Sequence, residues 1–305
     1  ILSYLKFRVS YGTSGKEAGM DYLNYTLYGT SNTVYNYLNH HPVYQGAYAA
    51  EINQLGNDQL SWETAYNLNA GIDLGFLDNR INLSADWYKR RNSDLIMNVN
   101  VSANKGVGRQ YQNVGEMVNK GIELVLNTHT VKSPDFNWYT TFTFSYNDNK
   151  LTKLDQGQLV RDFYPTYYEG DNFDELKKVK VTDIDPQTGL AQYQRVEENG
   201  TTTIVNTLTD ATLGNGENSY VNIGLSRAPY WGGFTNTFNY KNWELYVHMA
   251  YNLHYKVVNT LIQDYTNGRT WASRNLHKVP SRWKIWEKPG DQADIPMVNA
   301  GPSFI

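Results

Sequence analysis

The side chains that could do chemistry are scattered along this chain rather than gathered in one motif. His40-His41-Pro42 has the residue type of a metal ligand, but adjacent side chains in an extended chain point oppositely and no third ligand is spaced nearby. Residues 182–189 (TDIDPQTG) resemble half of a calcium loop, yet they lack the bidentate acidic residue, and Asp-Pro-x-x-Gly is ordinary turn chemistry. We predict no metal ion and no cofactor.

The motifs of nucleophilic and nucleotide chemistry are incomplete. Residues 224–228 (GLSRA) lack the final glycine of a nucleophile elbow, and residues 106–108 (GVG) lack the third glycine of a dinucleotide site. The chain has no cysteine, so thiol chemistry and disulfides are excluded. No nucleophile, base and orienting group share a recognisable arrangement, so we predict no catalytic residues and no enzyme.

The elements that would position these side chains are long β-strands. Residues 60–90 contain two runs in which apolar and polar side chains alternate, separated by a short connection at residues 77–80. The same period of two recurs in residues 5–12, 122–129, 136–147, 234–240 and 243–251, which makes about seven strands. Several of these strands reach the roughly 9–11 residues that cross a bilayer at a tilt.

The connections between the expected strands alternate strictly in length. Short turns are expected at residues 77–80, 130–135 and 241–242, and long links at residues 14–61, 94–118, 150–228 and from 258 onward. Outer-membrane barrels show this asymmetry, with tight periplasmic turns at one end and long extracellular loops at the other. We therefore expect an all-β fold, a transmembrane antiparallel β-barrel with long extracellular loops.

Composition agrees with a barrel. The mean hydropathy of −0.59 is low because half of each strand would face a polar lumen, and the 25 Tyr and 8 Trp could form the aromatic girdles of a membrane barrel. A net charge of −3 gives no basic footprint, so we expect no nucleic acid partner.

Alternation also assigns the two faces of the strands. The face expected to contact lipid includes Leu5, Phe7, Val9, Leu83, Leu124, Phe142, Phe144, Phe238, Leu245 and Val247. The face expected to line a wet lumen includes Lys6, Arg8, Glu63, Asp73, Asp86, Arg90 and Glu123.

Several motifs, taken in order, carry a family resemblance. They are LSWE at 60–63, GID at 71–73, NKGIEL at 119–124, DPQTG at 185–189, GGFTNTF at 232–238, and WEKPGD with DIP at 286–296. Together they resemble the C-terminal barrel of SusC/RagA-type TonB-dependent transporters. The resemblance implies that residues 1–305 are part of a barrel of about 22 strands, with the N-terminal plug and the final strands absent.

The resemblance also implies a function and partners. It implies TonB-dependent import of a nutrient, an oligosaccharide or a peptide, across the outer membrane of a Gram-negative bacterium. The implied partners are a SusD-like surface lipoprotein, the TonB–ExbB–ExbD complex acting through the missing N-terminal region, and outer-membrane lipid. The competing hypothesis is a soluble β-rich carbohydrate-binding module or glycoside hydrolase fragment.

Aromatic and arginine side chains in the long links are the candidate contact residues. Candidate substrate contacts, which could stack on sugar rings or only anchor the loops, with anchoring the favoured interpretation, are Tyr164, Tyr167, Tyr168, Tyr230 and Trp231. The partner surface is expected on residues 16–61 and 263–305, through Tyr25, Tyr28, Tyr35, Tyr44, Arg269, Trp271, Arg274, Arg282, Trp283 and Trp286.

Overall fold

The computed structural model describes residues 2–30, 43–44, 47–48, 50–161, 164–197, 199–212, 219–258 and 283–297. The chain divides into two compact units. The sheet unit comprises Ile1–Val160, Tyr167–Phe173 and Pro229–Leu253, and the small unit comprises Arg161–Thr166, Asp174–Ala228 and His254–Ile305.

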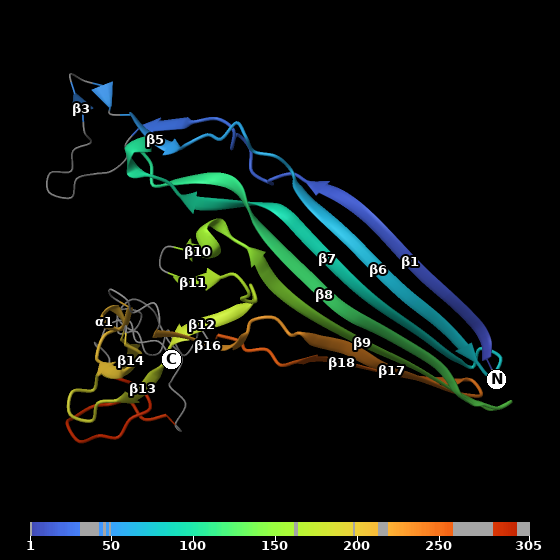
Figure 1. Cartoon of the computed structure of the whole chain (residues 1–305). Helices are drawn as coiled ribbons and strands as arrows, with labels where there is room; N and C mark the ends of the chain where they lie inside the picture. The colour runs from blue at the N-terminus through green and yellow to red at the C-terminus, as the bar shows by residue number, and fades with distance from the viewer. Residues whose placement is uncertain are drawn as a thin grey trace. The chain divides into compact units, whose positions relative to one another are not determined.

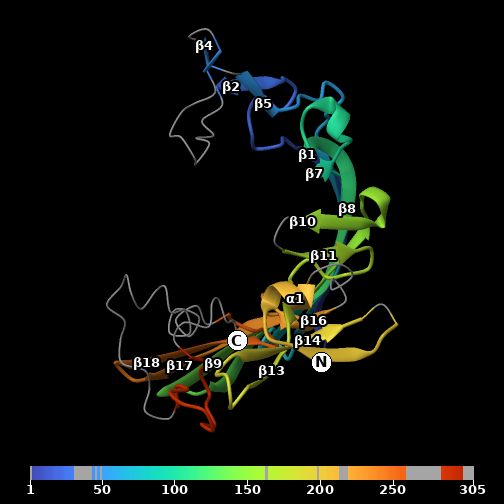
Figure 2. The same ribbon diagram turned by 90° about the vertical axis from the view of Figure 1, so that its left-hand side faces the viewer.

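The sheet unit is built on one antiparallel sheet of seven strands in the order β1-β6-β7-β8-β9-β17-β18 (Figure 1). Every predicted strand is present, so the prediction of an all-β fold with about seven long strands is confirmed. Figure 2 shows the sheet curved along its width, as expected of a segment of a barrel wall. The strands are β1 (Leu2–Lys16), β6 (Glu63–Phe76), β7 (Ile81–Asn100), β8 (Arg109–Lys132), β9 (Phe136–Lys153), β17 (Tyr230–Tyr240) and β18 (Trp243–Leu253).

The prediction of a long link over residues 94–118 was wrong. β7 continues to Asn100 and β8 begins at Arg109, so the connection is only residues 101–108, with a short 3-10 turn (Ala103–Lys105) inside it. The register shifts between Asn92 and Ile96, where Asp94 has a φ of 57°. This bulge interrupts the alternation of side chains, so the sequence pattern is lost although the strand continues.

The three tight turns lie at one end of the sheet, at the lower right in Figure 1. They are residues 77–80, 133–135 and 241–242. Leu77, Asp78, Asn79 and Lys241 have positive φ, the geometry that lets short connections follow the right-handed twist of the strands. The longer connections leave the sheet at its opposite end, so shorter and longer links alternate as predicted, although the link at residues 101–108 is much shorter than expected.

Short strands form within the longer connections at the loop end of the sheet. β2 (Leu27–Thr30) pairs with β5 (Ala50–Gln54), β3 (Val43–Tyr44) with β4 (Ala47–Tyr48), and β10 (Gln158–Arg161) with β11 (Tyr164–Tyr168) after a 3-10 turn at Asp155–Gly157. Leu151, Leu154 and Tyr167 form a small buried cluster there, with Met97 and Met117 packed against it.

The small unit has its own core. β12 (Glu175–Val179) pairs with β16 (Tyr220–Leu225), and β13 (Val181–Ile184), β14 (Ala191–Val196) and β15 (Thr202–Val205) form a three-stranded sheet. Tyr193 of β14 and Ala211 of the one-turn helix α1 (Leu208–Thr212) are buried together. Across the described ranges, no helix has both the length and the hydropathy needed to span a membrane.

Candidate functional site

One face of the seven-stranded sheet, called here the apolar face, carries apolar side chains in cross-strand rows. The strand register places these side chains directly opposite one another on neighbouring strands, so each row extends across the whole sheet. The first row is Leu5, Leu74, Leu83, Leu126, Phe142, Phe234 and Met249; the second is Phe7, Ile72, Ala85, Leu124, Phe144, Gly232 and Tyr251; the third is Val9, Ala70, Trp87, Ile122, Tyr146, Tyr230 and Leu253.

Aromatic residues flank these rows at both borders. At the border near the tight turns Trp138 stacks on Phe238 with ring centroids 5.4 Å apart, and at the other border Tyr146 stacks on Tyr230 at 4.9 Å. The 11 residues of β18 cross the whole band. At a rise of ~3.4 Å per residue and a tilt of ~40°, that length covers ~25 Å, the height of the apolar band of a membrane barrel. All ten side chains predicted to share a lipid-facing side lie on this face.

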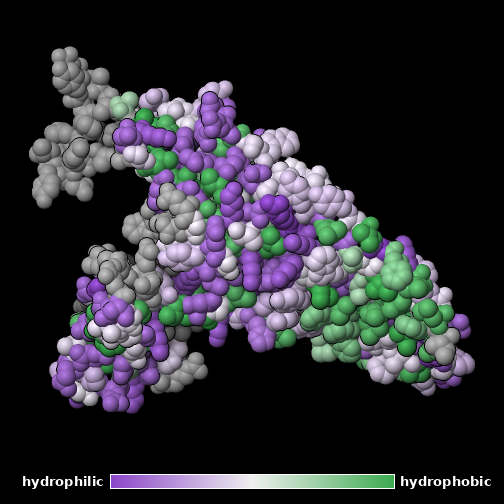
Figure 3. Space-filling view, viewed as in Figure 1, coloured by the Kyte–Doolittle hydropathy of each residue, from purple (hydrophilic) through white to green (hydrophobic). Residues whose placement is uncertain are grey.

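The hydrophobic surface ends abruptly along the strands. Figure 3 shows the largest group of hydrophobic residues over the end of the sheet that carries the tight turns, with mostly hydrophilic residues and smaller hydrophobic patches over the remainder. The next row on the apolar face after Trp87, Ile122 and Tyr146 brings Lys89, Lys120 and Asp148 side by side. The strands therefore extend beyond the apolar band into a polar environment at the loop end.

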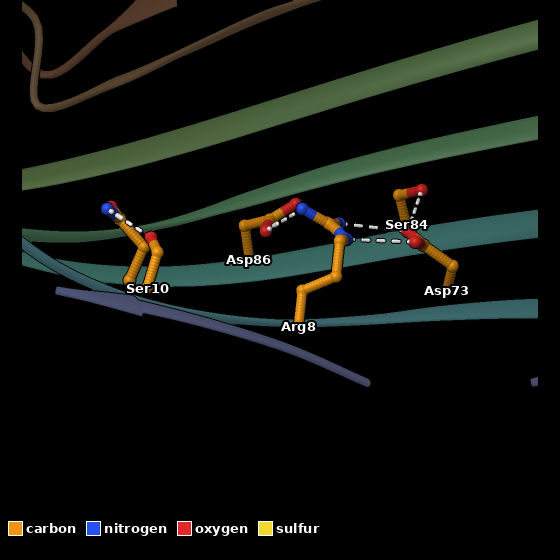
Figure 4. Close-up of polar contacts among 6 residues, drawn as sticks. Arg8, Ser10, Asp73, Ser84 and Asp86 are labelled. Carbon is orange, nitrogen blue, oxygen red and sulfur yellow. Dashed lines mark hydrogen bonds and ion pairs between the residues drawn. The ribbon is translucent and has the colours of Figure 1, made fainter. Parts of the chain in front are cut away.

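The opposite face, called here the polar face, carries an ion-pair network drawn in Figure 4. The Arg8 Nε donates to Asp73 Oδ2 at 2.9 Å, and Arg8 Nη2 lies 2.9 Å from Asp73 Oδ1 and 3.0 Å from Asp86 Oδ2. Ser84 Oγ donates to Asp73 Oδ1 at 2.7 Å. One guanidinium on β1 thus joins carboxylates on β6 and β7, a geometry suited to the planar fork of arginine.

Gly71 makes this network possible. The register places Gly71 between Arg8 and Asp86 in one cross-strand row of the polar face. A Cβ at position 71 would collide with the Asp86 carboxylate and lie about 3.0 Å from Arg8 Nη2. The absent side chain leaves the space through which Arg8 reaches past β6 to β7.

The remainder of the polar face is lined by hydrogen-bonding side chains. Tyr88 Oη donates to Asn147 Oδ1 at 2.9 Å, and Asn149 Nδ2 donates to Asn119 Oδ1 at 2.8 Å. The predicted lumen residues Lys6, Arg8, Glu63, Asp73, Asp86, Arg90 and Glu123 all lie on this face. Such a surface suits a water-filled interior, where charges stay hydrated.

The five predicted substrate contacts are not brought together. Tyr230 lies on the apolar face and Trp231 on the polar face. Tyr167 is buried in the Leu151 cluster, Tyr168 is exposed, and the side chain of Tyr164 lies outside the described part. Of the two predicted substrate contacts in β17, only Trp231 faces the polar side, and the substrate role of all five residues stays a prediction.

The predicted partner residues lie in several places. Tyr25 and Tyr28 are exposed in the sheet unit, at 60% and 70%, and Trp283 and Trp286 belong to the small unit. Tyr44 lies in β3, but its side chain is outside the described part. The other predicted residues, Tyr35, Arg269, Trp271, Arg274 and Arg282, lie outside the described residues, and the partner role stays a prediction for the whole set.

Two sequence motifs about a hundred residues apart meet in the small unit. Trp286 Nε1 donates to the Pro186 carbonyl at 2.8 Å, and the indole ring covers Gly189, where a Cβ would collide with it. Gly189 has a φ of 69°, so a glycine is required there for backbone reasons as well. Trp286 is one of the predicted partner contacts, and within the small unit its ring covers Gly189 while its N–H binds the Pro186 carbonyl.

The acidic residue of the turn at residues 185–189, Asp185, stabilises the turn itself. Asp185 Oδ1 accepts from the Gln187 N–H and Oδ2 from Thr188 Oγ1, both at 2.8 Å, and these bonds hold the pKa of the Asp185 carboxyl below its usual range. Within the described ranges, no three His, Cys, Asp or Glu side chains are grouped so as to hold a metal ion. The pair His40-His41 lies outside those ranges.

Comparison with known proteins identifies the sheet. Residues 2–253 match the family described as "TonB dependent receptor-like, beta-barrel". The chain is 26% identical over 95% of its length to TonB-dependent receptor P3 of Formosa agariphila, and 28% identical over 90% to TonB-dependent receptor SusC of Bacteroides thetaiotaomicron. It spans 29% and 27% of these two relatives.

A solved structure described as the RagAB peptide transporter superposes on 99% of the chain with a TM-score of 0.74 and 25% identity, the chain covering 32% of that structure. Three observations point to the same fold, a segment of a barrel wall. They are the register of the seven strands, the apolar band on one face and the family match over residues 2–253. The chain belongs to the TonB-dependent receptor family and forms part of its transmembrane β-barrel, resembling the SusC/RagA type.

Proposed function

We propose that the whole protein to which this chain belongs imports a nutrient across the outer membrane of a Gram-negative bacterium. The observation that carries the proposal is the pairing of two faces on one sheet: an apolar band about as tall as a bilayer core, and a polar face lined by Arg8, Asp73, Asp86 and their neighbours. Such a wall separates lipid from a hydrated interior, as a transport barrel requires.

Import would draw energy from the TonB–ExbB–ExbD complex through a region outside this chain. The family name refers to TonB, and the chain spans only about a third of the relatives it matches. A plug and a TonB-contacting segment would belong to the remaining length. The barrel wall would then act as a fixed frame, and the polar face would contact the plug and the passing substrate.

The substrate class that we propose is an oligosaccharide or a peptide, captured together with a SusD-like surface lipoprotein. This rests on the similarity to SusC and to a structure described as a peptide transporter. Among the predicted substrate contacts, Trp231 is the strongest candidate because it lies on the polar face. Among the predicted partner contacts, Tyr25 and Tyr28 are the strongest because both rings are exposed at the loop end.

No observation favours the competing function of a carbohydrate-binding module or glycoside hydrolase fragment. TonB-dependent receptors are transporters, not enzymes. A soluble module would also have no use for apolar rows that run across seven strands. Trp231 is therefore better assigned to a transport path than to a hydrolytic site.

Cell fractionation combined with uptake tests the proposal. The full-length protein should remain with the outer membrane until detergent is added, and deletion of its gene should abolish growth on the nutrient whose uptake requires it. A full-length protein that stays in the aqueous fraction without detergent would show that the transporter assignment is wrong.

The partner assignment has its own test. Deletion of residues 263–280 should abolish co-purification of the lipoprotein while the barrel stays resistant to heating in detergent. If the lipoprotein still co-purifies, the assignment of that segment to the partner surface is wrong, while the proposal of transport still stands.

A further inference from the structure

We propose that three lysines at the loop-end border of the apolar face bind the phosphate groups of outer-leaflet glycolipids, an inference that rests on the outer-membrane location proposed above. This lysine cluster comprises Lys89 of β7, Lys120 of β8 and Lys150 of β9. All three side chains project from the same face as the apolar rows. The cluster is therefore continuous with the surface that contacts lipid.

The arrangement of the cluster is unfavourable for the isolated chain. Lys89 lies directly opposite Lys120 on the neighbouring strand, and Lys150 lies opposite Val118, one row further along the strands. Side chains directly opposite in an antiparallel sheet have their Cβ atoms about 4.5–5.5 Å apart, and like charges there repel. A bound anion between the two strands would convert this repulsion into attraction.

Carboxylates within the described residues neutralise only part of the positive charge. Asp148 pairs with Lys120 at 3.4 Å, and Glu116 pairs with Arg91, the fourth cation of this region. Lys89 and Lys150 are exposed and make no ion pair with any described residue. The two carboxylates thus leave two ammonium groups available to a ligand.

The height of the cluster matches lipid headgroups. Lys89 and Lys120 lie two residues along their strands from Trp87 and Ile122 of the last apolar row, a step of ~7 Å. Basic residues that border an apolar membrane surface attract anionic headgroups. The corresponding row near the tight turns, just beyond Trp138 and Phe238, is uncharged and consists of Phe136, Tyr240 and Trp243.

This asymmetry identifies the leaflet and the ligand. The lysines are on the side of the long connections, which are extracellular in barrels of this class. The outer leaflet there contains phosphorylated glycolipids of the lipid A type. We therefore assign the cluster to the phosphates of such a headgroup, rather than to free phosphate or to an acidic protein surface.

The test uses the full-length protein in detergent, titrated with diphosphoryl lipid A and followed by native mass spectrometry. The triple variant Lys89→Gln/Lys120→Gln/Lys150→Gln should bind about 25- to 125-fold more weakly, since each basic residue near an anionic headgroup contributes about fivefold. The matched control Lys178→Gln/Lys180→Gln/Lys288→Gln, which removes three exposed lysines of the small unit, should bind as the unmodified protein does.

A second variant tests the same idea in the opposite direction. Asp148→Asn releases Lys120 from its ion pair and should tighten lipid A binding severalfold, whereas adhesion through the apolar band alone would leave binding unchanged. Both variants should keep the melting temperature of the unmodified protein within a few degrees, because the three lysines are exposed and Asp148 is partly exposed.

Several outcomes would overturn the assignment. Equal weakening by the control variant, equal binding of dephosphorylated lipid A, or competition by inorganic phosphate at the same concentration would each exclude a lipid phosphate site. Loss of the lipoprotein from the triple variant, with lipid A binding intact, would show that the cluster is a protein interface. If nutrient uptake fails while the variants bind lipid A as expected, the result counts against the proposed function and not against the lipid site.

Discussion

In the small unit Tyr193 and Ile295 are 3% and 2% exposed, whereas Ile122, in a central strand of the seven-stranded sheet, is 43% exposed. The small unit buries its apolar side chains against its own chain, through α1, the short strands and the segment that contains Trp286. The sheet instead presents its apolar rows to its surroundings. A core buried within the chain therefore stabilises the small unit, whereas a surrounding membrane must stabilise the sheet.

The largest effect is expected when a charge is placed on the apolar face of the sheet. Phe144→Arg puts a charge in the second apolar row and should cost about 2–4 kcal/mol of folding free energy in lipid. Ser145→Arg, on the polar face directly opposite Glu123, is the matched control and should cost less than about 1 kcal/mol. Refolding into lipid vesicles under a urea gradient measures both, and equal costs would contradict the assignment of the faces.

The next effect concerns the small unit alone. Gly189→Ala adds a Cβ where φ is 69° and Trp286 covers the backbone, so it should destabilise the unit by about 2–3 kcal/mol. Gly200→Ala is the control, because φ is 80° there but nothing lies within 4 Å, and it should cost only about 1–2 kcal/mol.

Hydrogen exchange in the full-length protein separates these two glycine variants. Faster exchange should appear in β13 and β14 after Gly189→Ala, with the seven-stranded sheet unchanged. Equal acceleration by both variants would show that contact with Trp286 contributes nothing.

A smaller effect tests the polar face of the sheet. Gly71→Ala should separate Arg8 from Asp86 and lower the melting temperature in detergent, since the new Cβ occupies the path of the guanidinium. Gly12→Ala adds the same methyl group to the polar face at a position in β1 where nothing lies within 4 Å, and should change the melting temperature little. The fall for Gly71→Ala should be smaller than that for Phe144→Arg, because water can solvate a displaced arginine on the polar face.

The smallest effect is a pH dependence confined to the small unit. The Gln187 N–H and the Thr188 hydroxyl lower the pKa of Asp185 in the folded state, so this carboxylate stabilises the turn above about pH 4, the ordinary aspartate pKa. That stabilisation is lost as the pH falls through the lower, folded-state pKa. Hydrogen exchange across residues 185–190 should accelerate in acid, and Asp185→Asn should remove this acceleration.

Much of the sheet was predictable because strand alternation is a local property. Side chains in a strand point alternately to opposite faces, so Phe142 and Phe144 on one side and Thr141 and Thr143 on the other could be assigned without any tertiary information. The same reasoning failed at Asp94, where the bulge breaks the period, and it did not detect short strands such as β2 and β5 within the long links.

The candidate sites were likewise predictable only in part, since alternation gives the face of each side chain but not its partners on other strands. Sequence alternation placed Arg8, Asp73 and Asp86 on one face, but their connection through a single guanidinium depends on the register of three strands and on the space left by Gly71. Likewise, the pairing of Lys89 with Lys120 follows only from the register of β7 against β8.

The chain by itself therefore determined the strand class, the two faces and the family resemblance, all of which depend on the order and period of neighbouring residues. Only the fold shows that Trp286 covers Gly189 and that lysines of three strands meet at one border. Contacts between residues distant in the sequence depend on cross-strand register and loop closure, which side-chain alternation does not encode.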